Sequence, residues 1–353
     1  MRELYLKSYK RWGYKGEPFF SLWKIKEKSK KDTETENVLG GLLGKEITGL
    51  VNYTPVGEKF RFYFPSLFTK RHSGFEGEWT CIKIGSGGYS TVYSCCQGDK
   101  YVALKVPKGF EAAIESMGKG ITPAVPMISV EIINALKNEF EIIQALNHPH
   151  LLKPIAFHGH KGFYFLVYEF ANYGSLEYQL KNGAFKDTRS ILTLTIQLAD
   201  ALRYLHSHEI IHGDVKPSNI LFVNKVAKLG DYSIAIRTID TARKLRIPLG
   251  TPGWRAPEQV DAELEEKTIK LGYQHKIDIY QLGNLLLFLL TGERLDGEEI
   301  LLHEDYLKKA LDKVNDQLIR KLLGKMLQKI PWDRISIEAV IDGLIKSLYV
   351  EQK

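Results

Sequence analysis

The stretch His212-Gly-Asp-Val-Lys-Pro-Ser-Asn219 decides how the rest of this sequence is interpreted. It places a carboxylate (Asp214), an amine (Lys216) and an amide (Asn219) in one short loop between two apolar runs that are typical of short buried strands. Such a loop can offer a proton acceptor, a cation for a phosphoryl oxygen and a neutral oxygen ligand for Mg²⁺. The stretch therefore favours phosphoryl-transfer chemistry if suitable partners occur elsewhere in the chain.

The stretch resembles the catalytic loop of eukaryotic-type (Hanks-type) serine/threonine protein kinases, and the resemblance runs from about Phe75 nearly to the C-terminus. It implies a bilobal α+β protein-kinase fold, with a small β-rich N-lobe that carries one key helix and a larger, mostly helical C-lobe. It implies ATP and Mg²⁺ as cofactors. In the loop it implies that Asp214 accepts the proton of a substrate hydroxyl, Lys216 neutralises the γ-phosphoryl group and Asn219 binds Mg²⁺.

A glycine-rich segment, Ile84-Gly-Ser-Gly-Gly-Tyr-Ser-Thr-Val-Tyr93, resembles the loop that covers the ATP phosphates in this family. Its glycines let the backbone approach the phosphates closely. Ordinary hairpin turns also use glycine, so the segment gains weight only from the lysine that follows it. The nucleotide contacts implied by the resemblance are Ile84, Gly85, Ser86, Gly87, Gly88, Val92, Ala103, Lys105, Glu169, Ala171 and Ser175.

Lys105 lies inside an otherwise apolar strand, where an unpaired ammonium would be costly, so it requires an anionic partner unless it reaches water from a sheet edge. Apolar residues at helical spacing predict a helix over 129–146, and Glu139 on that helix is the expected partner. The separation of Lys105 from Glu139 is longer than the family usually needs. Residues 108–130 therefore contain an insertion, whose glycines and prolines predict a loop over much of it.

The β-rich run 163–170 leads to 171–176, which resembles the interlobe hinge. Tyr168 would limit the back of the adenine pocket, although the run on its own is more typical of a plain edge strand and turn. Asp231-Tyr-Ser stands where the family carries its Mg²⁺-binding Asp-Phe-Gly, and Tyr232 can replace Phe as an apolar plug if its hydroxyl finds a partner. Asp231 is thus the second expected metal ligand.

Three other residues resemble structural features of the family. Glu258 is expected to form a buried ion pair with Arg334, and Asp278 is expected to brace the catalytic loop from a buried helix. Gly213 stands where kinases that require activation-loop phosphorylation normally carry an arginine for the phosphate. With glycine there, activity is expected not to depend strictly on phosphorylation of Thr238 or Thr241.

Two alternatives to an active protein kinase deserve comparison with it. Small-molecule phosphotransferases of the aminoglycoside or choline kinase type often carry His-Gly-Asp with Asn five residues after the Asp, but Lys216-Pro, the Ala-Pro-Glu closure and the Asp278 and Arg334 features favour a protein kinase. A pseudokinase scaffold usually lacks one of the four key residues, all of which are present here (Lys105, Asp214, Asn219 and Asp231). Lys216 with Thr251 resembles serine/threonine rather than tyrosine kinases.

The sequence divides into an N-terminal extension (1–74), an N-lobe (75–170) and a C-lobe (171–353). The first 31 residues carry ten Lys and Arg against three Glu, which equals the whole net charge of +7, and they are rich in aromatics. Packing of these aromatics against the N-lobe is favoured over a docking arm for an acidic partner or polyanion. Residues 47–69 predict a β-hairpin, with strands at 47–53 and 60–64.

The three cysteines, Cys81, Cys95 and Cys96, are odd in number and contain no C-x-x-C pair, which argues against a disulfide framework or a zinc site and favours a reducing compartment. The most apolar run, 282–290, is too short to span a bilayer. The N-terminus is too polar for a signal peptide. A protein without a transmembrane segment, located in the cytoplasm, is therefore expected.

Overall fold

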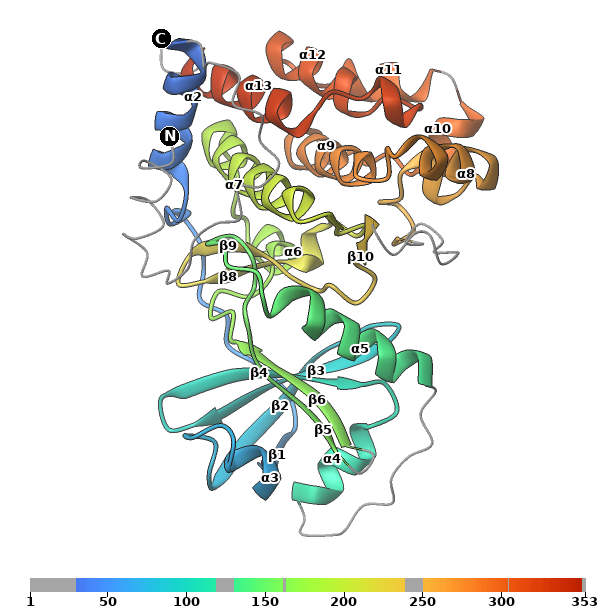
Figure 1. Ribbon diagram of the computed structural model, residues 1–353. Coiled ribbons are helices and arrows are strands. Elements are labelled where there is room, and N and C mark those ends of the chain that lie inside the picture. Colours follow the sequence, from blue (N-terminus) through green and yellow to red (C-terminus); the bar gives the residue numbers. More distant parts are fainter. Residues whose placement is uncertain (1–29, 119–129, 161–162, 239–249, 304, 351–353) are drawn as a thin grey trace.

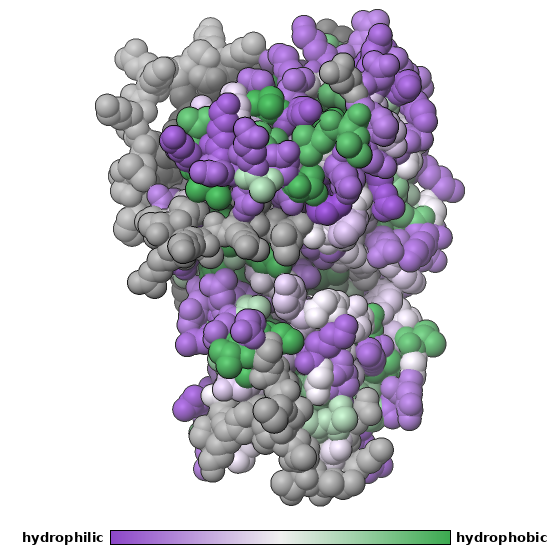
Figure 2. All heavy atoms as spheres, turned by 90° about the vertical axis from the view of Figure 1, so that its right-hand side faces the viewer, coloured by the Kyte–Doolittle hydropathy of each residue, from purple (hydrophilic) through white to green (hydrophobic). Residues whose placement is uncertain are grey.

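The computed structural model describes residues 30–118, 130–160, 163–238, 250–303 and 305–350. They form two lobes, a β-rich one and a helical one, joined by the segment that follows strand β6 and by residues 43–58 (Figure 1). Each lobe has its own hydrophobic core. On the face seen in Figure 2 the exposed hydrophobic residues are scattered among hydrophilic ones. The bilobal α+β architecture expected from the sequence is confirmed.

The N-lobe is a six-stranded antiparallel sheet in the order β1-β2-β3-β4-β6-β5. Aromatic rings fill its core, with Phe64, Phe68 and Phe75 in mutual contact. Its elements are β1 (Lys59–Tyr63), α3 (Ser66–Thr69), β2 (Glu78–Ser86), β3 (Ser90–Gln97), β4 (Lys100–Pro107), α4 (Glu111–Gly118), α5 (Val130–Ile143), β5 (Pro154–His160) and β6 (Phe163–Glu169).

Helix α5 is the key helix of the N-lobe, as predicted. It packs against β4, β5 and β6 and buries Leu136, Glu139, Ile142 and Ile143, which share one face at helical spacing. A glutamate in a buried stripe needs a cationic or hydrogen-bonding partner. The position of α5 therefore determines where Glu139 can meet such a partner.

The C-lobe is built on two buried helices, α7 (Thr188–Ser207) and α9 (Lys276–Thr291), which pack against each other. Asp187 caps α7 by accepting a hydrogen bond from the backbone N–H of Ser190. The remaining elements are α6 (Leu176–Lys181), β7 (Ile210–Ile211), η1 (Pro217–Asn219), β8 (Ile220–Val223), β9 (Val226–Leu229), β10 (Ile236–Arg237), η3 (Pro257–Gln259), α8 (Ala262–Leu271), α10 (Gly297–Leu302), α11 (Tyr306–Leu311), α12 (Gln317–Met326), η4 (Pro331–Asp333) and α13 (Ile337–Val350). Among the helices of the described ranges, none has the length and apolar character needed to cross a membrane.

The segment before the N-lobe binds to the C-lobe. Helix α2 (Lys30–Leu42) lies beside α7 and α13, and its last turns bury Leu39 and Leu42 (Figure 1). The chain then crosses to the hinge, where Tyr53 N–H donates to the carbonyl of Asn172 at 2.9 Å. The aromatic residues before position 30, whose packing was predicted, lie outside the described residues.

The predicted hairpin over 47–69 is wrong. Residues 47–53 form no strand, and β1 pairs with β2 instead. The apolar pattern that suggested a strand has another cause, since Ile47 is buried in the C-lobe core and Gln179 holds both the N–H and the carbonyl of Val51. Side-chain and backbone contacts with the C-lobe replace a partner strand.

The insertion between β4 and α5 is also more regular than predicted. Residues 111–118 form helix α4, which packs against β1, whereas 119–129 lie outside the described residues. Phe110 and Ile114 are buried in the N-lobe core, so apolar burial stabilises this part of the insertion as a helix.

The expectation of a chain without a disulfide is wrong, because Cys81 and Cys95 are disulfide-bonded. They face each other in the antiparallel register of β2 and β3, with Cα atoms 4.1 Å apart, so their side chains leave the sheet on the same face. Cys96, the next residue, points to the opposite face and is free. The argument from cysteine count for a reducing compartment therefore fails.

Candidate active site

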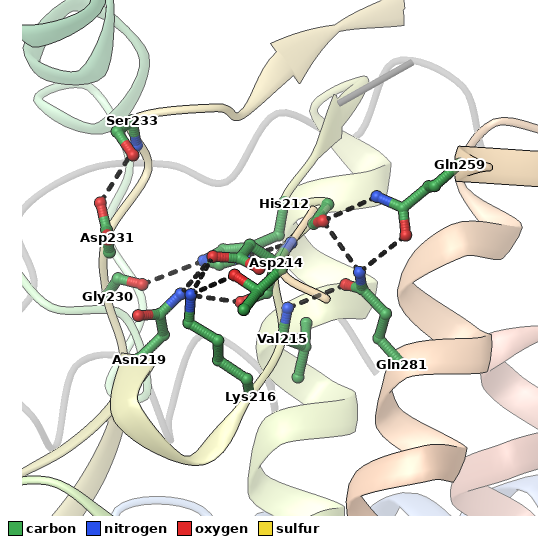
Figure 3. A network of polar contacts seen from close by, with 12 residues as sticks. His212, Asp214, Val215, Lys216, Asn219, Gly230, Asp231, Ser233, Gln259 and Gln281 are labelled. Atoms are coloured by element: carbon green, nitrogen blue, oxygen red, sulfur yellow. Dashed lines mark hydrogen bonds and ion pairs between the residues drawn. The ribbon is translucent and has the colours of Figure 1, made fainter. Parts of the chain in front are cut away.

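The loop 212–219 follows strand β7 and ends in η1, and it brings its three polar side chains together (Figure 3). Oδ2 of Asp214 accepts hydrogen bonds from Lys216 Nζ at 2.6 Å and from Asn219 Nδ2 at 3.0 Å. Asn219 Nδ2 also donates to the Asp214 carbonyl at 2.8 Å. The second oxygen, Asp214 Oδ1, is buried and has no hydrogen-bond partner within the described part of the chain. A buried carboxylate oxygen without a donor can accept one from a ligand.

Asp278 braces this loop from α9, as predicted. Its two oxygens accept the backbone N–H groups of His212 at 3.0 Å and Gly213 at 2.7 Å. Burial alone would raise the pKa of Asp278, but its hydrogen bond with His206 and the neighbouring charges outweigh burial and lower the pKa. Asp278 therefore stays an anion and holds the loop backbone through charge-assisted hydrogen bonds.

Lys105 on β4 contacts two carboxylates. Its Nζ lies 2.8 and 2.7 Å from the two oxygens of Glu139 on α5, and 2.8 Å from Oδ1 of Asp231. Burial alone would lower the pKa of Lys105, but the charges of Asp231 and Glu139 outweigh it and hold that pKa above its usual value. Burial would likewise raise the pKa of Asp231, yet the Lys105 ammonium holds it below its usual range. The cation and the Asp231 anion thus stabilise each other.

Asp231 is held next to the catalytic loop by backbone contacts. Gly230, the residue before it, donates its N–H to the carbonyl of Asn219 at 2.8 Å. Tyr232, the residue after it, is fully buried, and its hydroxyl donates to the carbonyl of Leu229 at 2.5 Å. The predicted condition for a tyrosine plug, a partner for its hydroxyl, is therefore met.

The glycine-rich segment is the turn between β2 and β3. The N–H of Gly87 donates to the carbonyl of Ser90 at 2.7 Å, which closes the turn. A Cβ built at Gly85 or at Gly88 would meet no other atom within 4 Å. The turn is anchored from the insertion, since Thr91 donates to Glu111 of α4 at 2.6 Å.

The remaining predicted nucleotide contacts lie around the hinge. Val92 and Ala103 lie on paired strands, opposite Lys105 and Tyr168 respectively. Ala171, in the hinge, is buried and its carbonyl accepts the N–H of Gly174. Glu169 accepts hydrogen bonds from the Lys153 backbone at 3.0 Å and pairs with Lys228 at 2.8 Å.

Ser175 precedes α6, and its Oγ caps that helix by accepting the N–H of Tyr178. Serine is a preferred residue at this capping position. For the other predicted residues, the structure brings the loop residues, Lys105, Glu139 and Asp231 into one cluster. Their catalytic, nucleotide-binding and metal-binding roles stay predictions.

The predicted ion pair between Glu258 and Arg334 is confirmed. Arg334 donates from both terminal nitrogens to the two carboxylate oxygens, at 2.6 and 2.7 Å, and both side chains are buried. This bidentate pair joins η3, at the end of the activation segment, to the residue that follows η4.

Sequence reasoning missed three polar groups that hold the site. The hydroxyl of Tyr168 donates to Oε1 of Glu139 at 2.7 Å, and the amides of Gln259 and Gln281 contact the loop backbone. One signal was available for Gln281, since it follows Asp278 by three residues on an apolar helix and therefore shares its face.

Comparisons with known proteins agree with this geometry. The family model described as protein kinase domain matches residues 80–344. The chain is 27% identical to "Serine/threonine-protein kinase PLK4" of Drosophila melanogaster, 32% to the human "Phosphorylase b kinase gamma catalytic chain, liver/testis isoform" and 30% to "Aurora kinase" of Eremothecium gossypii. These matches cover 73%, 59% and 69% of this chain and 32%, 49% and 64% of the relatives.

The chain thus spans about a third to about two thirds of the length of these curated relatives. The matched region includes the glycine-rich turn, Lys105, Glu139, the catalytic loop and Arg334. On the extent of this match and on its bilobal fold, the chain belongs to the protein kinase domain family.

Proposed function

We propose that this chain is a protein serine/threonine kinase that transfers the γ-phosphoryl group of ATP to Ser or Thr hydroxyls of proteins with the help of Mg²⁺. One observation carries the proposal. The buried Oδ1 of Asp214 lacks a donor in the described part of the chain, while Lys216 and Asn219 occupy Oδ2. A substrate hydroxyl is the kind of donor that such an oxygen would accept.

In this proposal Asp214 orients the attacking hydroxyl and accepts its proton, because its free oxygen is a hydrogen-bond acceptor. Lys216 lies beside the same carboxylate and neutralises charge on the transferred γ-phosphoryl group. Lys105, held by Glu139, binds the α- and β-phosphates. The turn at 84–88 covers those phosphates, and the hinge backbone at Glu169 and Ala171 binds adenine.

The residues present fit a magnesium site shared with nucleotide phosphates. No group of three or more His, Cys, Asp or Glu side chains suited to a metal ion gathers within the described ranges. Mg²⁺ usually binds one or two carboxylates together with substrate phosphates and keeps several waters, so such a group is not required. Asp231 and Asn219 would hold the ion, and bound Mg²⁺ would neutralise phosphate charge.

Two observations support this proposal over its alternatives. The relatives named above carry kinase titles. The Ala-Pro-Glu closure and Arg334, which favoured a protein kinase over a small-molecule phosphotransferase, are in contact through Glu258. Against a pseudokinase scaffold, Lys105 is paired with Glu139, and Asp214 with Asn219. The four residues whose loss marks pseudokinases are therefore present in an ordered cluster.

We further propose that activity does not depend strictly on phosphorylation of the activation segment, because Gly213 offers no cation for a phosphate. Residues 239–249, which include Thr241, lie outside the described residues. The lobe boundary at 170, binding of a polyanion by the basic N-terminus and a cytoplasmic location stay predictions.

The test is transfer of radiolabelled γ-phosphate to a generic protein substrate such as casein, with and without Mg²⁺, followed by phosphosite mapping. Wild-type protein should label Ser or Thr, and Asp214→Asn should reduce the rate by at least about 1,000-fold while ATP binding is kept. Wild-type activity no higher than that of Asp214→Ala would refute the proposed kinase activity. Activity on choline or an aminoglycoside but on no protein would favour the small-molecule alternative.

A further inference from the structure

We propose that Gln281 and Gln259 are positioning residues that hold the backbone of the catalytic loop in its working conformation without a phosphate on the activation segment. The inference rests on the proposed kinase activity. It adds to that activity the side chains that hold the catalytic loop in place, a role for which other kinases use an arginine and a phosphate.

The two glutamines meet at one carbonyl oxygen (Figure 3). The oxygen of Gly213 accepts a hydrogen bond from Gln281 Nε2 at 2.8 Å and a second from Gln259 Nε2 at 3.0 Å. A carbonyl oxygen has two lone pairs, so both are engaged by these amides. Gly213 immediately precedes Asp214, and its φ of 76° lies in the left-handed region. The two donors therefore hold the peptide that aims the Asp214 side chain.

Gln281 also holds the loop on the other side of Asp214. Its Oε1 accepts the N–H of Val215 at 2.8 Å. Asp278, three residues earlier on α9 and hence on the same helix face, accepts the N–H groups of His212 and Gly213. One face of a buried helix thus fixes the backbone on both sides of Asp214.

Gln259 connects this brace to the end of the activation segment. Its Oε1 accepts the backbone N–H of Ala256 at 2.7 Å and the Nε2 of Gln281 at 3.0 Å. A Cβ added at Gly250 would come within 2.8 Å of Gln259 Nε2, so Gly250 lies directly against the same amide. Gln259 therefore joins residues 250–256, the catalytic loop and α9 in one neutral network.

The chemistry of amides explains why this brace would be independent of phosphorylation. An arginine at position 213 would place a cation beside the catalytic loop, and that cation would need an anionic partner such as a phosphate. Gly213 adds no charge and needs no such partner. Each glutamine acts as both donor and acceptor and carries no charge, so the network is complete without a phosphate. Gln281 is fully buried and Gln259 nearly so, which shields these hydrogen bonds from water.

The experiment compares Gln281→Met and Gln259→Met with a matched control, Gln197→Met, in the phosphatase-treated chain of 353 residues. Methionine keeps the volume and removes the amide. Gln197 is also fully buried on a C-lobe helix, and its Nε2 donates to two carbonyls, those of Leu42 and Lys45, each at 3.0 Å. These contacts lie in the N-terminal segment, away from the catalytic loop.

Both loop variants should lower kcat by about 10- to 100-fold while KM for ATP changes less than about threefold, because displacement of the catalytic carboxylate affects the transfer step. The control should keep kcat within about twofold. Amide hydrogen exchange over residues 213–219, measured by mass spectrometry, should be faster in Gln281→Met than in wild-type protein or the control.

Outcomes that refute the brace differ from those that refute the kinase. If wild-type protein transfers phosphate and the loop variants do so equally well, the brace is wrong and the kinase stands. If wild-type protein transfers no phosphate, the proposed function fails, and amide hydrogen exchange alone decides whether the glutamines hold the loop. Unchanged exchange over 213–219 in Gln281→Met overturns the brace in either case.

Discussion

The hydroxyl of Tyr168 donates a hydrogen bond of 2.7 Å to Oε1 of Glu139, the carboxylate that also holds Lys105 through both of its oxygens. The contact ties β6, which leads into the hinge, to α5, the helix that carries Glu139. All three side chains are buried. Hydrogen bonds inside a protein are shielded from water and are therefore stronger than those at the surface. The hydroxyl of Tyr168 and the ammonium of Lys105 thus fix the position of the Glu139 carboxylate.

Replacement of Tyr168 by Phe should weaken this arrangement without opening a cavity. Loss of the hydroxyl removes one donor to a buried carboxylate, so we expect the free energy of unfolding to fall by about 1 kcal/mol and kcat/KM for ATP to fall by about 3- to 10-fold. Steady-state kinetics and urea unfolding measure both. Tyr280→Phe, which removes a buried hydroxyl bonded to the Leu295 carbonyl at 3.1 Å, is the control for stability alone. Equal kcat/KM values for the two variants would contradict a positioning role for Tyr168.

Phosphatase treatment should leave most of the activity in place. Gly213 provides no cation to receive a phosphate from the activation segment, so removal of phosphate from Thr238 or Thr241 removes no ion pair with that position. We expect treated and untreated protein to differ by less than about threefold in kcat. Mass spectrometry of both samples verifies that the phosphate has been removed. Complete loss of activity on phosphatase treatment would show that the kinase does depend on phosphorylation, despite the glycine at position 213.

Replacement of Gly213 by Ala should destabilise the protein, because its φ of 76° is costly for a residue with a Cβ. We expect a loss of about 1 kcal/mol in the free energy of unfolding. Gly41→Ala is a matched control on helix α2, where an added Cβ meets nothing within 4 Å and φ is not positive. That change should instead stabilise by about 0.5 kcal/mol. Chemical denaturation separates the two signs.

The buried Glu258–Arg334 pair should contribute far more to the free energy of unfolding than an exposed ion pair does. Glu258→Gln would leave the Arg334 guanidinium buried with its charge uncompensated, which should cost about 3 kcal/mol of unfolding free energy. The control is Glu177→Gln, which breaks the exposed pair with Lys181 at 3.0 Å and should change stability by less than about 0.5 kcal/mol. Similar effects of both changes on the denaturation midpoint would refute a structural role for the buried pair.

Acidification should destabilise the fold through His150. Burial, together with the charge of His148, lowers the pKa of His150 to about 3, while the hydrogen bond with the Ala227 backbone and the charge of Asp200 offset part of the shift. The unfolded chain binds a proton near the ordinary histidine pKa of 6.5 and the folded chain does not, so stability is lost as the pH falls from about 6.5 toward 3. Between pH 7.5 and 5.5 this group should remove about 1 kcal/mol.

The structural reason is that both ring nitrogens of His150 are engaged. Nε2 accepts the N–H of Gly44 at 2.9 Å, and Nδ1 contacts the carbonyl of Ala227 at 2.7 Å, so a second proton on the ring would break the hydrogen bond from Gly44. His150→Asn should be less stable at pH 7.5 and should show a smaller change with pH. Denaturant titrations at the two pH values test this, and an equal pH dependence in the variant would assign the effect to other histidines, such as His275.

The catalytic loop, Lys105 with Glu139, Asp278 and the Glu258–Arg334 pair could all be predicted from the sequence. In each case a polar residue lies in or next to an apolar strand or helix. The order of these residues along the chain is typical of the protein kinase family. A buried charge needs a partner, so the presence of Lys105 in an apolar strand already required something like Glu139. The catalytic and binding roles of these residues stay predictions, although the structure brings the side chains together.

Other features were decided only by the tertiary structure. The Cys81–Cys95 bond depends on strand register, and the course of residues 47–53 depends on the C-lobe surface that they meet. The contacts of Gln259 and Gln281 with Gly213 join residues far apart in the chain. Local periodicity reports which face of an element is apolar, but a hydrogen bond between distant polar groups leaves no such pattern. For that reason the sequence by itself determined the family and the charged cluster, whereas only the folded chain showed what holds Asp214 in place.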